Sequence, residues 1–148
     1  MSILQGATTS FKVELFQAVH NFGPTSPNTF KVALYTASAN INADTTVYTT
    51  TNEVTGTGYT AGGNTLTIST SPTSGNNSSN IPTAYISFTN TSWTNATFTA
   101  RAALIYNTSQ SNKSVAVLDF GSDKTVSNDT FQIIFPTPDA NSAIVRIA

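Results

Sequence analysis

The side chains that could carry out chemistry are few and widely spaced. His20 is the only histidine, and histidine is the residue best suited to acid–base work near neutral pH. Catalysis or metal binding would need a partner motif, and neither such a motif nor a Gly-x-Ser-x-Gly nucleophile elbow is present. Because His20 falls near the end of an expected helix, we expect it to interact with the last carbonyl groups of that helix.

The seven carboxylates form no convincing catalytic pair. Glycoside cleavage needs two carboxylates across a cleft. Asp119 and Asp123 are close in sequence, but the Phe120-Gly-Ser between them is typical of a strand entering a turn. The spacing of a calcium-binding loop is missing, and a chain without cysteine forms neither disulfides nor thiolate metal sites. We therefore expect no catalytic residue, no metal and no cofactor, and we predict that the protein is not an enzyme.

A glycine-rich stretch resembles a phosphate-binding loop in its spacing alone. Gly58 and Gly63 have the separation that such a loop uses, but Asn64 stands where lysine is needed. No helix-forming segment follows, so phosphates would lack both the cation and the helix dipole. The pattern favours a tight turn or bulged corner between strands.

The aromatic residues offer the strongest alternative chemistry, a platform on which sugar rings stack. Aromatic side chains also fill the cores of sandwiches and the interfaces between subunits, and we favour that interpretation. Trp93 lies among polar neighbours, which indicates partial exposure. The residues that could form a platform are Trp93, Tyr48, Tyr59, Tyr85 and Tyr106.

The composition is poor in charge and rich in hydroxyl and amide side chains. Charged residues make up 9% of the chain, whereas Thr, Ser and Asn together account for 59 of 148 residues. Such a surface repels its neighbours weakly, so many copies can pack closely. With a net charge of −1 and no basic stripe, we expect no nucleic-acid partner. No stretch resembles a membrane helix or a signal peptide, so we also expect no membrane partner.

Hydrophobic periodicity predicts one helix, residues 10–22, at the start of the chain. Ser10 is the expected cap, and Gly23 followed by Pro24 is the expected stop. Phe16 falls off the main apolar stripe, so this helix is expected to contact a second surface as well. The stripe itself consists of Phe11, Leu15, Val19 and Phe22.

Short alternating segments then predict strands to the end of the chain. The polar residues 71–80 are expected to form an exposed loop. About eight or nine short strands favour an all-β fold, namely an antiparallel, jelly-roll-like β-sandwich with one N-terminal α-helix. The strand order remains open at this point. The expected strands cover residues 30–36, 47–51, 53–59, 65–70, 83–89, 97–107, 114–120, 130–135 and 143–147.

The length of the chain fits a single domain. We expect residues 1–9 to form an N-terminal arm and residues 10–148 to form one sandwich domain that includes the helix. Exposure arguments alone suggest four interface residues. These are Ile3, Leu4, Phe16 and Trp93.

Several stretches together resemble small β-rich virion proteins of tailed bacteriophages. They are residues 29–39 (TFKVALYTASA), 52–66 (NEVTGTGYTAGGNTL) within 48–67, 101–107 (RAALIYN), 115–121 (VAVLDFG) and 133–148 beginning IIFPTP. The opening pattern Phe11-Lys-x-Glu-Leu-Phe with His20-Asn-Phe22 belongs to the same likeness. The resemblance covers most of the chain and contains no catalytic motif.

This resemblance implies a capsid decoration or cement protein that binds and stabilises the shell. The implied partners are the major capsid protein and further copies of the chain, as a dimer or trimer. The implied location is the capsid surface of the virion, after synthesis in the cytoplasm of the bacterial host. The alternative is a structural component of the tail or a tail fibre, with glycan binding as a possible activity.

Overall fold

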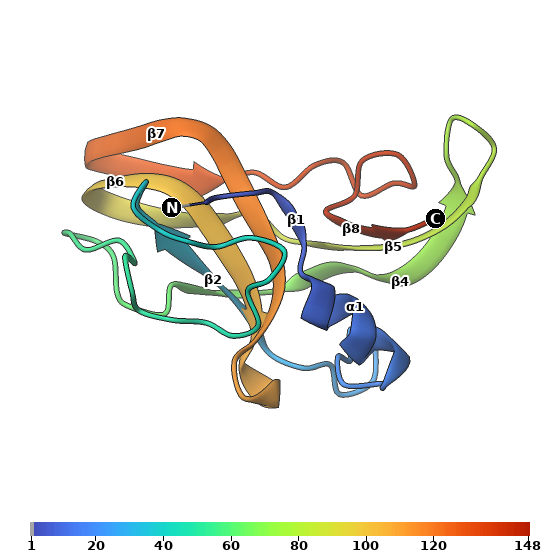
Figure 1. Cartoon of the computed structure of the whole chain (residues 1–148). Helices are drawn as coiled ribbons and strands as arrows, with labels where there is room; N and C mark the ends of the chain where they lie inside the picture. Colours follow the sequence, from blue (N-terminus) through green and yellow to red (C-terminus); the bar gives the residue numbers. More distant parts are fainter. Residues whose placement is uncertain (1) are drawn as a thin grey trace.

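The computed structural model describes residues 2–148. These residues form two antiparallel sheets and one α-helix, which confirms the expected all-β sandwich with a helix near its start. Figure 1 shows the β6–β7 hairpin on one side, the β4–β5–β8 sheet on the other, and α1 between them at one end. The elements are β1 (Gly6–Ala7), α1 (Thr9–Phe16), β2 (Phe30–Tyr35), β3 (Asn64–Leu66), β4 (Ile68–Asn76), β5 (Pro82–Phe88), β6 (Thr91–Asn107), the 3-10 helix η1 (Thr108–Gln110), β7 (Lys113–Ile133) and β8 (Val145–Ile147).

The larger sheet has five strands in the order β1-β7-β6-β2-β3. Its centre is the long β6–β7 hairpin, whose register runs from Thr91 opposite Ile133 to Asn107 opposite Lys113. The expected strands 114–120 and 130–135 are thus parts of one strand. Bulges interrupt the pairing at several points, and such bulges bend a strand and increase its twist. The β6–β7 hairpin is therefore strongly curved, as Figure 1 shows.

The smaller sheet has three strands in the order β4-β5-β8. The expectation of an exposed loop at residues 71–80 was wrong for its first half, because β4 continues to Asn76 and pairs with β5. Pro72 is tolerated there because β4 is an edge strand, and the register shifts between Thr70 and Thr73 around it. The polar side chains of this strand are mostly exposed. The composition of residues 71–76 is therefore typical of a loop, although these residues form part of a strand.

The helix is shorter than the expected residues 10–22, and its cap is Thr8 rather than Ser10. The helix ends because Ala18 adopts a left-handed conformation with φ 56°. The N–H of Ala18 donates to the carbonyl of Leu15 and that of Val19 donates to Glu14, which is the Schellman arrangement that closes a helix end. The chain then turns back well before Gly23.

The main core lies between the two sheets and α1. It takes Phe11 from the helix, Phe30 from β2 and Phe88 from β5, together with Phe22 from the segment after the helix. The rings of Phe22 and Phe30 stack with centroids 4.4 Å apart. Three residues of the apolar stripe predicted for a longer helix therefore share this core, although Phe22 enters it from the segment after the helix. They are Phe11, Leu15 and Phe22.

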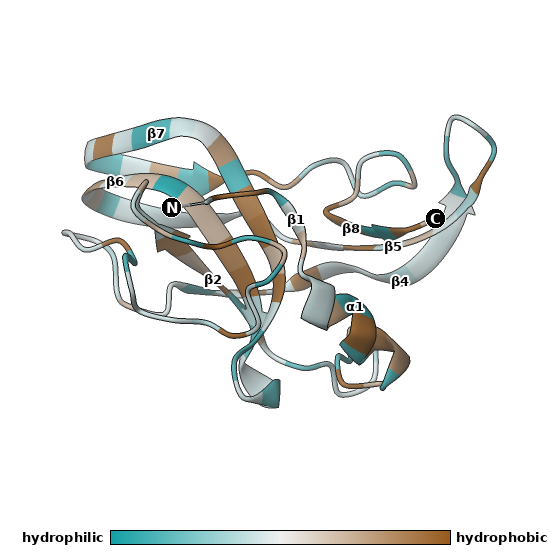
Figure 2. Ribbon diagram, viewed as in Figure 1, coloured by the Kyte–Doolittle hydropathy of each residue, from teal (hydrophilic) through white to brown (hydrophobic). Residues whose placement is uncertain are grey.

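A second apolar cluster covers the opposite face of the five-stranded sheet. Ala33 and Tyr35 of β2 and Leu104 of β6 contact Ala39 and Ile41, which belong to the long connection between β2 and β3. The sheet is buried on both faces in this region. Figure 2 shows the result as hydrophobic colour on the inner parts of β2, β6 and β7, whereas β4 is pale.

The expected arm, residues 1–9, is not detached from the domain over its described part. Gly6 and Ala7 pair with Val117 and Ala116 of β7, and Ile3 forms a parallel bridge with Ile41. Thr8 is fully buried. Gly6 and Ala7 therefore form an edge strand of the five-stranded sheet of their own chain. Met1 lies outside the described residues.

Candidate functional site

The first group of titratable side chains in the structure centres on Glu14 of α1. One carboxylate oxygen of Glu14 lies 2.7 Å from His20 Nε2, and the other accepts a hydrogen bond of 2.6 Å from Lys113 Nζ. His20 Nδ1 accepts a hydrogen bond from Asn107 Nδ2 at 3.0 Å, so its proton lies on Nε2 and points at Glu14. The prediction that His20 contacts the last carbonyls of the helix was wrong, because the early helix end carries it back to Glu14.

This group fastens the helix to the β6–β7 hairpin. Burial raises the pKa of Glu14, but the hydrogen bonds from Lys113 and His20 outweigh it and leave that pKa below its ordinary value. The carboxylate is thus charged near neutral pH. Because the side chain of His20 is fully buried and both its nitrogens are bonded, the group has the properties of a structural clamp.

A second polar group surrounds Glu53, which is buried in the connection between β2 and β3. Its carboxylate accepts hydrogen bonds from Tyr48 Oη at 2.7 Å, Tyr59 Oη at 2.6 Å and the backbone N–H of Gly62 at 2.6 Å. Burial and the hydrogen bond to Glu53 raise the pKa of Tyr59 and of Tyr48. Burial and the charge of Glu53 raise the pKa of Tyr106 to about 12. These tyrosines therefore remain donors and hold the connection against the sheet.

The glycine-rich stretch forms a turn, as predicted, and leaves no room for phosphate. The N–H of Gly62 is taken by Glu53, and its carbonyl accepts a hydrogen bond of 2.7 Å from Tyr106. Gly63 has φ +69°, and a Cβ at that position would lie 1.8 Å from the carbonyl oxygen of Val32. Glycine is required there by the close approach of β2.

Among the interface residues predicted from sequence, Trp93 is buried and not at the surface as expected. It is 4% exposed and lies in the main core, with its ring 6.0 Å from Tyr59 and 5.9 Å from Phe131. Its polar neighbours are the solvent-facing residues of β6. Tyr106 is buried as well and stacks on the half-buried Tyr48, so neither Trp93 nor Tyr106 offers an exposed face on which a sugar ring could stack.

The other three candidates lie at or near the surface. Ile3 is half-buried against the second apolar cluster, and Leu4 is 61% exposed. Phe16 is 95% exposed at the end of α1. Phe16 is therefore the most exposed of the four candidates, and burying its ring against a partner would contribute free energy of binding.

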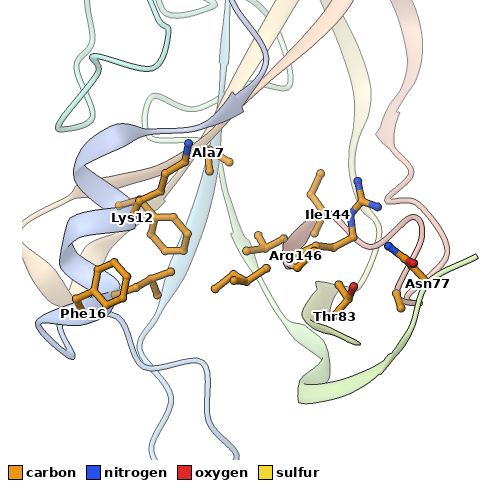
Figure 3. Close-up of a pocket in the computed structure, with 14 residues that line it drawn as sticks. Ala7, Lys12, Phe16, Asn77, Thr83, Ile144 and Arg146 are labelled. Carbon is orange, nitrogen blue, oxygen red and sulfur yellow. The ribbon is translucent and has the colours of Figure 1, made fainter. Parts of the chain in front are cut away.

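Phe16 stands at the rim of a cleft between α1 and β8. The cleft has a volume of about 860 Å³, and Figure 3 shows Phe16 and Lys12 on the helix wall facing Ile144 and Arg146 on the other. The lining is mostly apolar and includes Leu15 and Ala116. This α1–β8 cleft is the candidate functional site. Sequence reasoning found Phe16 but missed the opposite wall, because nothing in residues 143–147 indicates that they face the helix.

No group of three or more His, Asp or Glu side chains in residues 2–148 could hold a metal ion. No helix in the same part of the chain is both long and apolar enough to span a membrane.

Comparisons with protein families, with curated proteins and with solved structures found no match.

Proposed function

We propose that this chain is a non-enzymatic structural protein of a tailed-phage particle, and that it decorates or cements the capsid by binding the major capsid protein. The observation that carries this proposal is Phe16, a phenylalanine 95% exposed at the rim of an apolar cleft. Exposed apolar surface next to a groove is typical of a binding site for another macromolecule.

The composition supports a protein that works in many copies. With 9% charged residues, neighbouring copies repel each other weakly when they are packed on a shell. Burying one phenylalanine contributes roughly 1.5–3 kcal/mol. A contact of that size is weak alone, but linked neighbours hold one another at a high effective concentration. Contacts between copies, as a dimer or trimer, would add to the binding to the shell.

The polar groups of the structure are consistent with this role, because both buried carboxylates are used internally. Glu14 binds Lys113 and His20, and Glu53 binds two tyrosines and a backbone N–H. Fully bonded buried polar groups of this kind stiffen a small domain. The side chains that line the cleft include no carboxylate, and the titratable ones among them are Lys12 and Arg146.

The test is the binding of purified chain to phage heads assembled without it. Sedimentation should show saturable binding to the heads, and Phe16→Ser should weaken it by about tenfold or more, since burial of that ring is lost. Ile134→Ser is the matched control, because Ile134 is 71% exposed and does not line the cleft.

Equal loss with both variants would refute the role of the cleft. Binding to isolated tails in place of heads would move the function to tail assembly, and absence of binding to any particle would contradict the proposal.

A further inference from the structure

The wall of the cleft opposite the helix is a sheet edge. β8 pairs with β5 through Ala84 with Ile147, Tyr85 with Arg146 and Ile86 with Val145. On its other side, no strand within residues 2–148 lies beside it. An unpaired edge presents backbone N–H and C=O groups that can pair with another extended chain.

The floor and walls of the cleft suit apolar side chains. A second hollow of about 340 Å³ adjoins the first and shares with it Phe11, Leu15, Val145 and Ile147. Val145 is half-buried and Ile147 is 57% exposed, although both are apolar residues of a strand. Since alternate residues of an added strand point to the same side, every second side chain of that strand would enter these hollows.

The charged side chains of the cleft are both cations. Lys12 projects from α1 and Arg146 from β8, on opposite walls in Figure 3. No lining side chain is a carboxylate. Two acids lie next to lining residues in the sequence, and both are already bonded. Glu14 binds Lys113 and His20, and Asp139 accepts hydrogen bonds from the backbone N–H groups of Asn141 and Ser142. Arg146 also donates a hydrogen bond to the backbone carbonyl of Asn141, and Ala148 lines the same cleft. The side chains still give the cleft an excess of positive charge, which is complementary to a segment that carries negative charge.

We propose that the α1–β8 cleft binds an extended segment of another protein, which adds as a strand to β8. Every second residue of this segment is apolar and fills the hollows, and at least one acidic side chain pairs with Lys12 or Arg146. The inference rests on the proposed function only for the identity of the protein that carries the segment, namely the shell subunit.

A second copy of the chain fits this cleft less well. In a symmetric dimer across the cleft, each copy would bring its own Lys12 and Arg146 toward those of the other. Like charges facing each other disfavour such a contact. The occupant is therefore a chain of different sequence with opposite charge.

The test is a selection from displayed random peptides of about six residues, the usual length of a strand, on the immobilised full chain. Enriched sequences should alternate apolar residues with Asp or Glu. Synthetic versions should lose binding when alternate backbone nitrogens on one edge are methylated, and should keep it when those on the other edge are methylated. That asymmetry is specific to strand addition.

Charge variants then assign the acidic contact. Lys12→Glu and Arg146→Glu should each weaken the selected peptides by about tenfold and shift the selected sequences toward Lys or Arg. Lys124→Glu makes the same charge change outside the cleft and should have no effect. All three side chains are exposed, so thermal unfolding should verify that each variant remains folded.

Three results would overturn the inference: no enrichment, a selected set without acidic residues, or binding that is indifferent to backbone methylation. Concentration-dependent dimers that Lys12→Glu strengthens would identify a second copy as the occupant instead. The peptide selection uses the isolated chain, whereas the sedimentation assay uses phage heads. A negative selection would therefore contradict only the strand-addition inference, and absence of binding to particles would contradict only the proposed function.

Discussion

Trp93 and Phe16 are two aromatic residues for which the structure makes opposite stability predictions. Trp93 is 4% exposed in the core and Phe16 is 95% exposed on the helix. Trp93→Ala should destabilise the fold by about 3–5 kcal/mol, from lost burial and the cavity left behind. Phe16→Ser should change the free energy of unfolding by about 0.5 kcal/mol or less.

Trp93→Phe separates two opposing contributions. The indole Nε1 of Trp93 is buried and has no hydrogen-bond acceptor among the described residues. An unsatisfied buried donor costs about 1–3 kcal/mol, and phenylalanine removes that cost while it loses part of the ring volume. The two effects oppose each other, so we expect a net change within about 1 kcal/mol, well below that of the alanine variant.

The assay is urea unfolding followed by far-ultraviolet circular dichroism, because Trp93 is the only tryptophan and its fluorescence disappears in the variants. The reasoning would be refuted by a Trp93→Ala variant within about 1 kcal/mol of wild type. It would be refuted equally by a Phe16→Ser variant that loses more than about 1.5 kcal/mol.

Three further predictions concern single sites. The folded-state pKa of Glu14 lies below its ordinary value of 4.5, so its stabilisation is present above that pH and is lost as the pH falls through the lower folded value. Glu14→Gln should therefore be less stable than wild type near neutral pH, and the difference in stability between the two should become smaller in acid. Urea midpoints measured at neutral and at acidic pH check this, and an equal difference between variant and wild type at both would contradict it. Gly63→Ala places a Cβ 1.8 Å from the Val32 carbonyl oxygen, whereas Gly121→Ala, at φ +76°, meets nothing within 4 Å. Thermal unfolding should show a loss of about 1–2 kcal/mol for Gly121→Ala and a clearly larger one for Gly63→Ala, and equal losses would argue against the close approach. Thr8→Ala removes the helix cap and should lose about 1 kcal/mol in the same assay; an unchanged midpoint would show that the cap contributes nothing.

The sequence predicted the architecture because alternation and turn residues are local signals. Residues 30–36 and 83–89 appear as β2 and β5 almost at the predicted bounds. The helix end was missed for an equally local reason. Ala18 carries no signal for a left-handed conformation, whereas Gly23 and Pro24 are strong stop signals that the helix never reaches.

The position of Trp93 could not be predicted because a bulge breaks the alternation of β6. The register shifts between Trp93 and Ala96, and Asn95 adopts a positive φ of 49°. Both Trp93 and Ala96 are therefore buried although they are three residues apart. Simple period-two alternation would place them on opposite faces.

The clamp at Glu14 depends on contacts between distant parts of the chain. Lys113 is 99 residues from Glu14, and Asn107 is 87 residues from His20. The pairing of β6 with β7, whose register ends with Asn107 opposite Lys113, places the two side chains together. No spacing within the sequence predicts such a group. The α1–β8 cleft could not be predicted for the same reason, because its two walls lie at opposite ends of the chain.

The most direct test of the central claim is cryo-electron microscopy of the purified phage at a resolution that shows side chains. We predict that this chain forms a regular lattice on the capsid, with the α1–β8 cleft turned toward the major capsid protein and Phe16 buried in the contact. Density confined to the tail, or a capsid lattice in which the cleft faces solvent, would contradict it.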